Sequence, residues 1–385
     1  MKVLQTIAGM SLAAGGPTTC TYDLLTGMET LAPGVVRLLT VSNSDPKVRN
    51  AGSESNWLKE VPNDYKSPVC FSKNIKEVIK ESVYDIYHTN GLWMHINHIT
   101  CSEARKKEKP YVITPHGMLY PNALSRSAWK KWPMRKLWFD KDVLKASCVH
   151  VTCETEMNHV RNFGYKGPIA VIPNPLFVPE YMHDIYHVRK RKKINARLTV
   201  GFLGRLHPIK VVENLLRGVA LRKQMSIDVF IIGSGDKEYE KFLHKECAHL
   251  GISEQVKFLG FLNGFDKFAQ LAQLDALFVP SDMENFGMIV PEALIVGTPV
   301  MASLGTPWEA LNSERCGWWR DNSPESIAKV IDELYELSPE EHYAMGLRGR
   351  EYVLSTFAAG HVAEQMMLLY KWLVGEAYKP EFVFA

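Results

Sequence analysis

The sequence lacks the features that mark disulfide-stabilised, zinc-binding or membrane-spanning chains. Seven cysteines are scattered over 385 residues, and none forms a Cys-x-x-Cys pair. Their odd number and spacing indicate free thiols in a reducing cytoplasm. No apolar run reaches the roughly 20 residues that span a bilayer. Met1–Ile7 also lacks the apolar core and cleavage site of a signal peptide, so we expect a cytoplasmic protein.

An excess of charge of one sign is missing as well. The formal net charge is +3, so the overall balance implies no nucleic-acid partner. The sequence shows no short-period repeat and no low-complexity segment. A hydrophobic content of 46% is ordinary for a globular protein, and the length predicts two domains, each with its own core.

Short apolar runs alternate with helical patterns, which is typical of an α/β fold. We expect strands at residues 3–7, 35–41, 85–88, 111–114, 148–152, 169–172, 198–203, 228–232, 256–259, 276–280 and 300–302. These predict two open parallel sheets, in domains 1–178 and 198–358. Residues 179–197 include the basic run Arg189–Lys193, which favours a solvated linker.

The most informative stretch is Ser281–Leu294, which leads from a predicted strand into a predicted helix. Glu284 lies on the loop, and Glu292 lies in the first helical turn, just after Pro291. Gly287 allows a tight turn that presents N–H groups, and a helix N-terminus attracts phosphate. The alternative is that Glu292 only stabilises the helix start. We interpret the stretch as a site for a sugar diphosphate.

Cations and a histidine follow other strands, where ligands of parallel sheets bind. Arg205 and Lys210 could neutralise a diphosphate leaving group, as Mg²⁺ does elsewhere, or they could be plain surface charge. His116 follows a strand and precedes Gly117, and it could be functional or structural.

Several other patterns are less specific. Gly15–Pro17 could bring N–H groups close to a phosphate or an acceptor, or could be a simple turn. Gly233–Gly235 lacks the third glycine of a dinucleotide fingerprint. Asp140 and Asp142 have the spacing of a metal pair but lie in a helical pattern, so we expect a solvated face and no metal site.

Trp129–Phe139 mixes cations with aromatic residues, which suits an anionic membrane surface. The alternative is a helix that packs its aromatic face on the core. Arg105–Lys107 adds positive charge to the same half, and this favours membrane contact.

Taken together, the motifs resemble those of a GT-B glycosyltransferase of retaining family 4. They occur in the family's order and cover nearly the whole chain. The matching pieces are Gly15–Pro17, Pro115–Gly117, Pro173–Pro175, Gly204–Leu206 with Lys210, Gly233–Gly235, and Glu284 and Glu292 around Phe286–Gly287. The resemblance implies two Rossmann-like domains whose parallel sheets face each other across a cleft. It also implies that a C-terminal helix, within 359–385, completes the first domain.

The resemblance implies roles for individual residues. The expected catalytic residues are His116, Arg205, Lys210 and Glu284. The expected donor-binding residues are Gly16, Gly233, Phe261, Leu262, Phe286, Gly287, Met288, Ile289 and Glu292. The expected acceptor-binding residues are Gly15, Asn90 and Trp93. Val211 departs from the glycine that is common in the family after the lysine, and a β-branched residue restricts that loop.

The expected reaction moves a sugar, with retained anomeric configuration, from a nucleoside-diphosphate sugar, foremost a UDP-sugar. The expected acceptor is a saccharide or a polyprenyl-diphosphate-linked saccharide at the inner face of the cytoplasmic membrane, as in capsule or O-antigen assembly. No metal or other cofactor is expected. Two alternatives stay open: a GT-B-like sugar phosphate synthase or nucleotide-sugar epimerase, and a non-catalytic subunit that binds sugar nucleotides.

Overall fold

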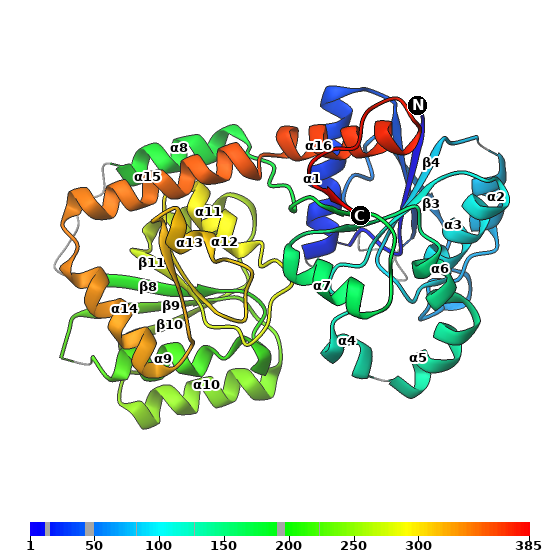
Figure 1. Ribbon diagram of the computed structural model, residues 1–385. Helices are drawn as coiled ribbons and strands as arrows, with labels where there is room; N and C mark the ends of the chain where they lie inside the picture. Colours follow the sequence, from blue (N-terminus) through cyan, green and yellow to red (C-terminus); the bar gives the residue numbers. More distant parts are fainter. Residues whose placement is uncertain (12–15, 43–49, 82, 127, 191–196, 223) are drawn as a thin grey trace. The chain divides into compact units, whose positions relative to one another are not determined.

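A computed structural model describes residues 1–11, 16–42, 50–81, 83–126, 128–190, 197–222 and 224–385 (Figure 1). The chain forms two compact units. Unit 1 comprises Met1–Phe177 together with Ala358–Ala385, and unit 2 comprises Val178–Phe357.

Unit 1 is built on a sheet that has eight strands within the described ranges, in the order β14-β7-β6-β5-β4-β1-β2-β3. All neighbours pair in parallel except β14, which is antiparallel to β7. The strands are β1 (Val3–Ile7), β2 (Val36–Val41), β3 (Leu58–Val61), β4 (Ile86–Asn90), β5 (Tyr111–Thr114), β6 (Cys148–Val151), β7 (Ile169–Val171) and β14 (Val383–Phe384).

Helices cover both faces of this sheet, and successive strand residues are therefore buried on opposite faces. Val3 and Ile86 belong to one apolar cluster, and Leu4 and Tyr87 belong to another. The helices are α1 (Gly16–Leu31), α2 (Asn74–Glu81), α3 (His95–Lys106), α4 (Pro121–Ser125), α5 (Ala128–Met134), the π-helical η3 (Arg135–Phe139), α6 (Asp140–Leu144), α7 (Glu154–Asn162) and α16 (Ala359–Leu373), with a 3-10 turn η2 (Asp64–Lys66).

Helix α16 packs along α1 and buries Met366, Leu369 and Tyr370 in the first of these clusters (Figure 1). The two helices approach closely at Gly27, where a Cβ would lie 2.6 Å from the carbonyl oxygen of Ala359. Residues that are far apart in the sequence therefore complete one core.

Unit 2 is built on a fully parallel sheet with the order β10-β9-β8-β11-β12-β13 in its described part. Its strands are β8 (Leu198–Leu203), β9 (Ile227–Ile232), β10 (Val256–Gly260), β11 (Ala276–Val279), β12 (Val300–Ser303) and β13 (Gly317–Arg320). Its helices are α8 (Glu180–Lys190), η4 (Pro208–Lys210), α9 (Val212–Ala220), α10 (Lys237–Leu250), α11 (Gly264–Gln273), α12 (Ile289–Ile295), α13 (Ala310–Ser313), α14 (Pro324–Glu336) and α15 (Pro339–Thr356). The order reverses direction between β8 and β11, as in a Rossmann sheet.

The expected α/β class with two parallel sheets is confirmed, and the expected strands lie within two residues of those observed.

The linker expected over 179–197 is wrong in its first part, because α8 occupies it and packs on α11. Arg189 is not solvated there. Its guanidinium donates to the carbonyl oxygens of Ala272, Leu274 and Gly297, which end the neighbouring helices. Residues 191–196 lie outside the described ranges.

Candidate functional site

Residues 286–289 and Glu292, which were expected to bind the donor, follow β11 at the switch point of unit 2. β8 and β11 are neighbours, so the loops that follow them lie beside each other. The N–H of Asp282 donates to the carbonyl of Ile209 at 3.0 Å and joins the two loops directly. Ligands of doubly wound sheets bind beyond the carboxyl ends of the strands at this point.

This junction brings Lys210 and Glu284 into an ion pair, although they are 74 residues apart in the chain. Both side chains are largely buried, with 17% and 13% of their surface exposed. The hydroxyl of Ser281 donates to the same carboxylate oxygen at 3.0 Å, and the N–H of Glu284 donates to Gly305 at 2.9 Å. Two side chains therefore hold the carboxylate, a third bond holds the backbone of Glu284, and the pair keeps both charges out of bulk water.

Arg205 lies on the loop after β8, but its side chain is exposed. Within the part of the chain that the structure describes, no carboxylate forms an ion pair with it. Arg205 therefore offers a positive charge that is available to an anionic ligand, whereas Lys210 already holds Glu284.

Glu292 is also paired, with a residue that the sequence analysis missed. Lys267 of α11 contacts its carboxylate at 2.8 Å, and 19% and 8% of the two side chains is exposed. Lys267 does not follow a strand and lies 25 residues before Glu292. Only the tertiary packing of α11 beside α12 reveals the contact.

The backbone between the two carboxylates turns sharply. Gly287 has φ +79°, in the left-handed region that glycine adopts without strain. The N–H groups of Val290 and Glu292 donate to Gly287 and Met288, whereas those of Met288 and Ile289 reach no carbonyl acceptor in the described ranges. These two donors are open to an anion, although α12 is too short at seven residues for its dipole to contribute much.

Phe286 was expected to bind the donor, but its ring is buried. It packs against Trp308 and Phe357 at centroid distances of 5.2 and 5.7 Å. Trp308 Nε1 donates to the Phe286 carbonyl at 2.5 Å. A ligand could therefore meet only the backbone of this residue.

Other expected donor residues differ in how the fold uses them. Gly233 is required by packing, since a Cβ there would collide with the Gly204 carbonyl. Phe261 and Leu262 follow β10, at the edge of the sheet, and 68% of Phe261 is exposed. Val211 has φ +50° and so adopts, at a cost, the left-handed backbone that a glycine would accept freely.

In unit 1, the structure brings together two of the expected residues. Asn90 ends β4 and His116 follows β5, and Asn90 Oδ1 lies 3.4 Å from His116 Nε2. His116 is half-buried and has φ +50°. Burial, and then the neighbouring His150, lower the pKa of His116 to about 3, so the ring is neutral near pH 7.

The remaining expected acceptor residues lie elsewhere or outside the described part. Trp93 packs its ring on Phe139 at 5.4 Å and lies under Lys131 Nζ at 5.7 Å. Gly16, which was expected to bind the donor, begins α1 and is exposed, with open space where a Cβ would stand, so packing does not explain this glycine. Gly15 lies outside the described residues.

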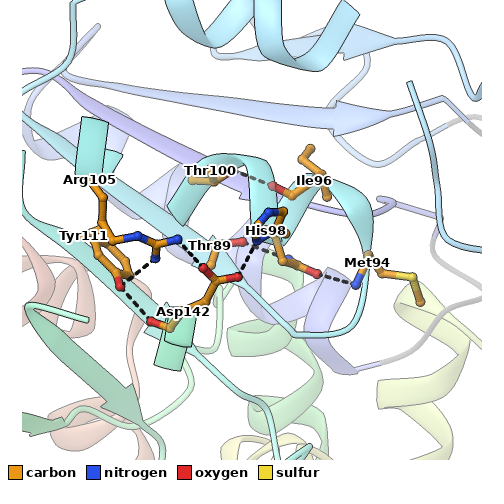
Figure 2. A network of polar contacts seen from close by, with 9 residues as sticks. Thr89, Met94, Ile96, His98, Thr100, Arg105, Tyr111 and Asp142 are labelled. Carbon is orange, nitrogen blue, oxygen red and sulfur yellow. Dashed lines mark hydrogen bonds and ion pairs between the residues drawn. The ribbon is translucent and has the colours of Figure 1, made fainter. Parts of the chain in front are cut away.

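Asp142 is no part of a solvated face, and Figure 2 shows its carboxylate in contact with Arg105 and His98. Only 1% of its side chain is exposed, and its carboxylate contacts Arg105 at 2.6 Å and His98 at 2.7 Å. Tyr111 donates to the Asp142 carbonyl and accepts from Arg105. Asp140 pairs separately with Arg135 at 2.9 Å. Across the described residues, no cluster of three or more His, Cys, Asp or Glu could hold a metal ion.

The basic aromatic stretch is exposed at most of its rings. Trp129, Trp132 and Trp138 are 76%, 62% and 44% exposed, as is 64% of Leu137, whereas Phe139 is buried. The alternative of an aromatic face packed on the core therefore holds for Phe139 alone among these side chains. The structure contains no helix, within the described ranges, that is long and apolar enough to cross a membrane.

The cations of the second basic run, Arg105–Lys107, all make contacts within unit 1. Arg105 pairs with the buried Asp142, and Lys106 pairs with Glu103 at 2.7 Å. Lys107 donates to the carbonyl of Ile79 at 2.8 Å. Arg105 and Lys107 thus serve contacts within unit 1, whereas 58% of the Lys106 side chain is exposed, and the membrane contact stays a prediction.

Two family models match the chain, one in each half. Residues 14–176 match Glycosyltransferase Family 4, and residues 187–352 match Glycosyl transferases group 1. The two matches do not overlap and leave only short segments uncovered.

Curated relatives and solved structures agree with these matches. An uncharacterised glycosyltransferase of Methanocaldococcus jannaschii is 30% identical over 47% of this chain and 48% of its own length. A D-inositol 3-phosphate glycosyltransferase of Mycolicibacterium gilvum is 28% identical over 46% of this chain and 39% of its own. The chain thus spans less than half the length of these two relatives. The crystal structure of Anabaena HepE in complex with UDP is similar in fold, with a TM-score of 0.73, 19% identity and coverage of 95% and 98%.

Proposed function

Because this chain belongs to the GT-B glycosyltransferases of the family 4 type, we propose that it moves a sugar from a nucleoside-diphosphate sugar to a saccharide hydroxyl with retention of anomeric configuration. The observation that carries the proposal is the Lys210–Glu284 pair at the switch point of unit 2. It joins a cation suited to a diphosphate and a carboxylate suited to sugar hydroxyls in one contact.

The charges of this site fit the departure of a diphosphate. As the bond between the anomeric carbon and the diphosphate oxygen breaks, negative charge grows on the diphosphate. Arg205 and Lys210 compensate that charge, and the N–H groups of Met288 and Ile289 add donors. The acceptor hydroxyl attacks from the same face of the sugar and gives its proton to the departing diphosphate oxygen. Glu284 and Glu292 hold the sugar and the ribose, and no side chain acts as a covalent nucleophile.

In the proposed complex, the donor binds beside two lysine–carboxylate pairs that exist without it. Glu284 and Glu292 each accept from a lysine in the structure. A sugar or ribose hydroxyl can share these carboxylates, because each oxygen has two lone pairs. Lys210 can then turn toward the diphosphate while Ser281 continues to donate to Glu284.

The donor can be identified by screening UDP-, GDP-, ADP- and dTDP-sugars for thermal stabilisation and hydrolysis. We expect UDP-sugars to give the largest thermal stabilisation and the fastest hydrolysis, since the similar Anabaena HepE structures hold UDP and UDP-glucose. NMR of the transfer product should show retained configuration, and an inverted product would refute that part of the proposal. Turnover of the sugar nucleotide that needs no acceptor would favour an epimerase or phosphate synthase instead.

Replacing Lys210 tests the diphosphate role directly. We expect Lys210→Ala to lower kcat at least about 100-fold, because one charge-stabilising donor is lost. Lys241→Ala is the matched control, since Lys241 pairs with Glu238 on the exposed surface of α10. Full activity of Lys210→Ala would refute the role.

We also propose that no metal is needed, so a chelator should leave turnover unchanged.

We propose that the acceptor is lipid-linked and that Trp129–Phe139 meets an anionic membrane at its cytoplasmic face. Exposed indole rings and Leu137 can enter the headgroup region, and Lys136, 5.7 Å from the Trp132 ring, adds positive charge. Vesicle co-sedimentation checks this contact. Binding to vesicles of phosphatidylglycerol should fall about tenfold or more in the double variant Trp129→Ala/Trp132→Ala. The exposed Tyr378→Ser is the control in the same unit. Equal binding of both variants would contradict the proposal.

A further inference from the structure

A continuous chain of hydrogen-bonded polar groups crosses the sheet of unit 1 and ends at the half-buried His116. It runs from β7 through β6, β5 and β4 to α16, and returns through β1 to the end of β4. Its members are the Ile172 carbonyl, His150, Thr114, His88, Tyr370, Gln5, Asn90 and His116. Consecutive members are 2.5–3.4 Å apart.

The direction of every bond in this chain follows from its first member. The Ile172 carbonyl can only accept, so His150 Nε2 donates to it at 2.8 Å. Burial lowers the pKa of His150 to about 4, and the ring is neutral. His150 Nδ1 must therefore accept from the Thr114 hydroxyl, at 2.7 Å.

The next hydrogen bonds lead to the C-terminal helix α16. The Thr114 oxygen accepts from His88 Nε2 at 2.6 Å. His88 is fully buried and its pKa lies well below the usual range, so its Nδ1 accepts from the Tyr370 hydroxyl at 2.5 Å. With its proton committed to His88, the Tyr370 oxygen accepts from Gln5 Nε2 at 2.9 Å.

The orientation of Tyr370 fixes two amides in turn. The oxygen of Gln5 accepts from Asn90 Nδ2 at 3.1 Å, which directs Asn90 Oδ1 to His116 Nε2. A second carbonyl supports this orientation independently, since Asn90 Nδ2 also lies 3.5 Å from the Thr6 carbonyl oxygen. His116 Nε2 must donate, because it faces an oxygen that only accepts.

We propose that this chain of hydrogen bonds fixes His116 as its Nε2–H tautomer, so that Nδ1 accepts a hydrogen bond from a substrate hydroxyl, and that Tyr370, Gln5 and Asn90 are positioning residues. The substrate part of this inference rests on the proposed function. In the described part of the chain, His116 Nδ1 has no donor of its own. Tyr370 thereby gives α16 a role in the site as well as in the core.

The tautomer can be read in the unmodified protein by NMR of ¹⁵N-histidine-labelled chain, with the His116 signals assigned by their loss in His116→Gln. We expect the proton on Nε2 and none on Nδ1 near neutral pH. A proton on Nδ1, or a charged ring, would overturn the proposal. This NMR measurement does not depend on enzyme activity, so its result is independent of whether glycosyl transfer is detected.

Tyr370→Phe tests whether the chain imposes the tautomer. Its matched control is Tyr165→Phe, whose buried hydroxyl donates only to the carbonyls of Ala146 and Pro168. In Tyr370→Phe we expect mixed tautomers of His116 and a fall in kcat of about tenfold with little change in the donor KM. Tyr165→Phe should keep the wild-type tautomer. Unchanged His116 signals in Tyr370→Phe would remove Tyr370 from the positioning role.

Discussion

Two tyrosine hydroxyls in unit 1 are both buried but differ in their partners. Tyr87 is fully buried, and its hydroxyl has no hydrogen-bond partner in the described part of the chain. The hydroxyl of Tyr165 reaches two backbone carbonyls at 3.0 and 3.2 Å. A buried polar atom without a partner loses its hydration and gains nothing in return.

We therefore expect Tyr87→Phe to raise the free energy of unfolding by about 1 kcal/mol and Tyr165→Phe to lower it by about 1–2 kcal/mol. Urea unfolding of the two variants beside the wild type measures both changes. A loss of stability in Tyr87→Phe would show that its hydroxyl does have a partner in solution.

Sequence pattern predicted the positions of individual site residues better than their partners. Glu284, Lys210 and Asn90 follow or end strands, where a parallel sheet gathers its ligand-binding groups. Lys267 was missed because nothing local distinguishes it from other helix-surface lysines. The Asp142 network was also missed, since a helical pattern does not tell which face is buried once a π-helical turn shifts the register.

Among the elements, the contact of α1 with α16 depends on one small residue. The Cβ of an alanine at Gly27 would lie 2.6 Å from the Ala359 carbonyl oxygen and 3.2 Å from Ala363 Cβ. Gly360, in the first turn of α16, has nothing within 4 Å of such a Cβ.

Gly27→Ala should separate the two helices and destabilise unit 1 by about 1–3 kcal/mol. Gly360→Ala, in open space on the same helix pair, should be neutral or slightly stabilising. Hydrogen–deuterium exchange in α16 should accelerate in the first variant only. Equal protection of α16 in both variants would mean that the helices can adjust at no cost.

Long buried strands were the most predictable elements, because apolar runs between turn residues need no knowledge of neighbours. The edge strands β3, β13 and β14 were not predicted, whereas the edge strand β10 was. Of the four residues of β3 only the last, Val61, is buried, and β14 has two residues. Helix α8 was mistaken for a linker because Arg189 lies in a basic run, whereas the fold uses that charge on helix-end carbonyls.

For the whole molecule, the buried histidines predict a stability that falls in acid. His88 and His150 are 0% and 5% exposed, and burial lowers the pKa of both, that of His150 to about 4. In the unfolded chain both regain a pKa near about 6.5. Between these values the unfolded chain binds protons that the folded chain does not, so lowering the pH favours unfolding.

Stability should thus be greatest above pH about 6.5 and decline as the pH falls toward about 4, by up to about 1.4 kcal/mol per pH unit for each histidine. Urea unfolding across this range measures the slope. His150→Gln should reduce the slope, because Gln can bond Thr114 and Ile172 without titrating. An equal slope in that variant would assign the acid effect to carboxylates.

The return of α16 to unit 1 also has a consequence for synthesis. Gln5 and its partner Tyr370 are 365 residues apart, whereas unit 2 is one uninterrupted segment. On the ribosome, unit 2 can therefore fold before the last helix of unit 1 has been made. Until then, the part of the unit 1 core that packs on α16 stays uncovered. The same nested order makes unit 2 behave as a domain inserted into unit 1, so the first half of the chain needs protection from aggregation until translation passes Tyr370.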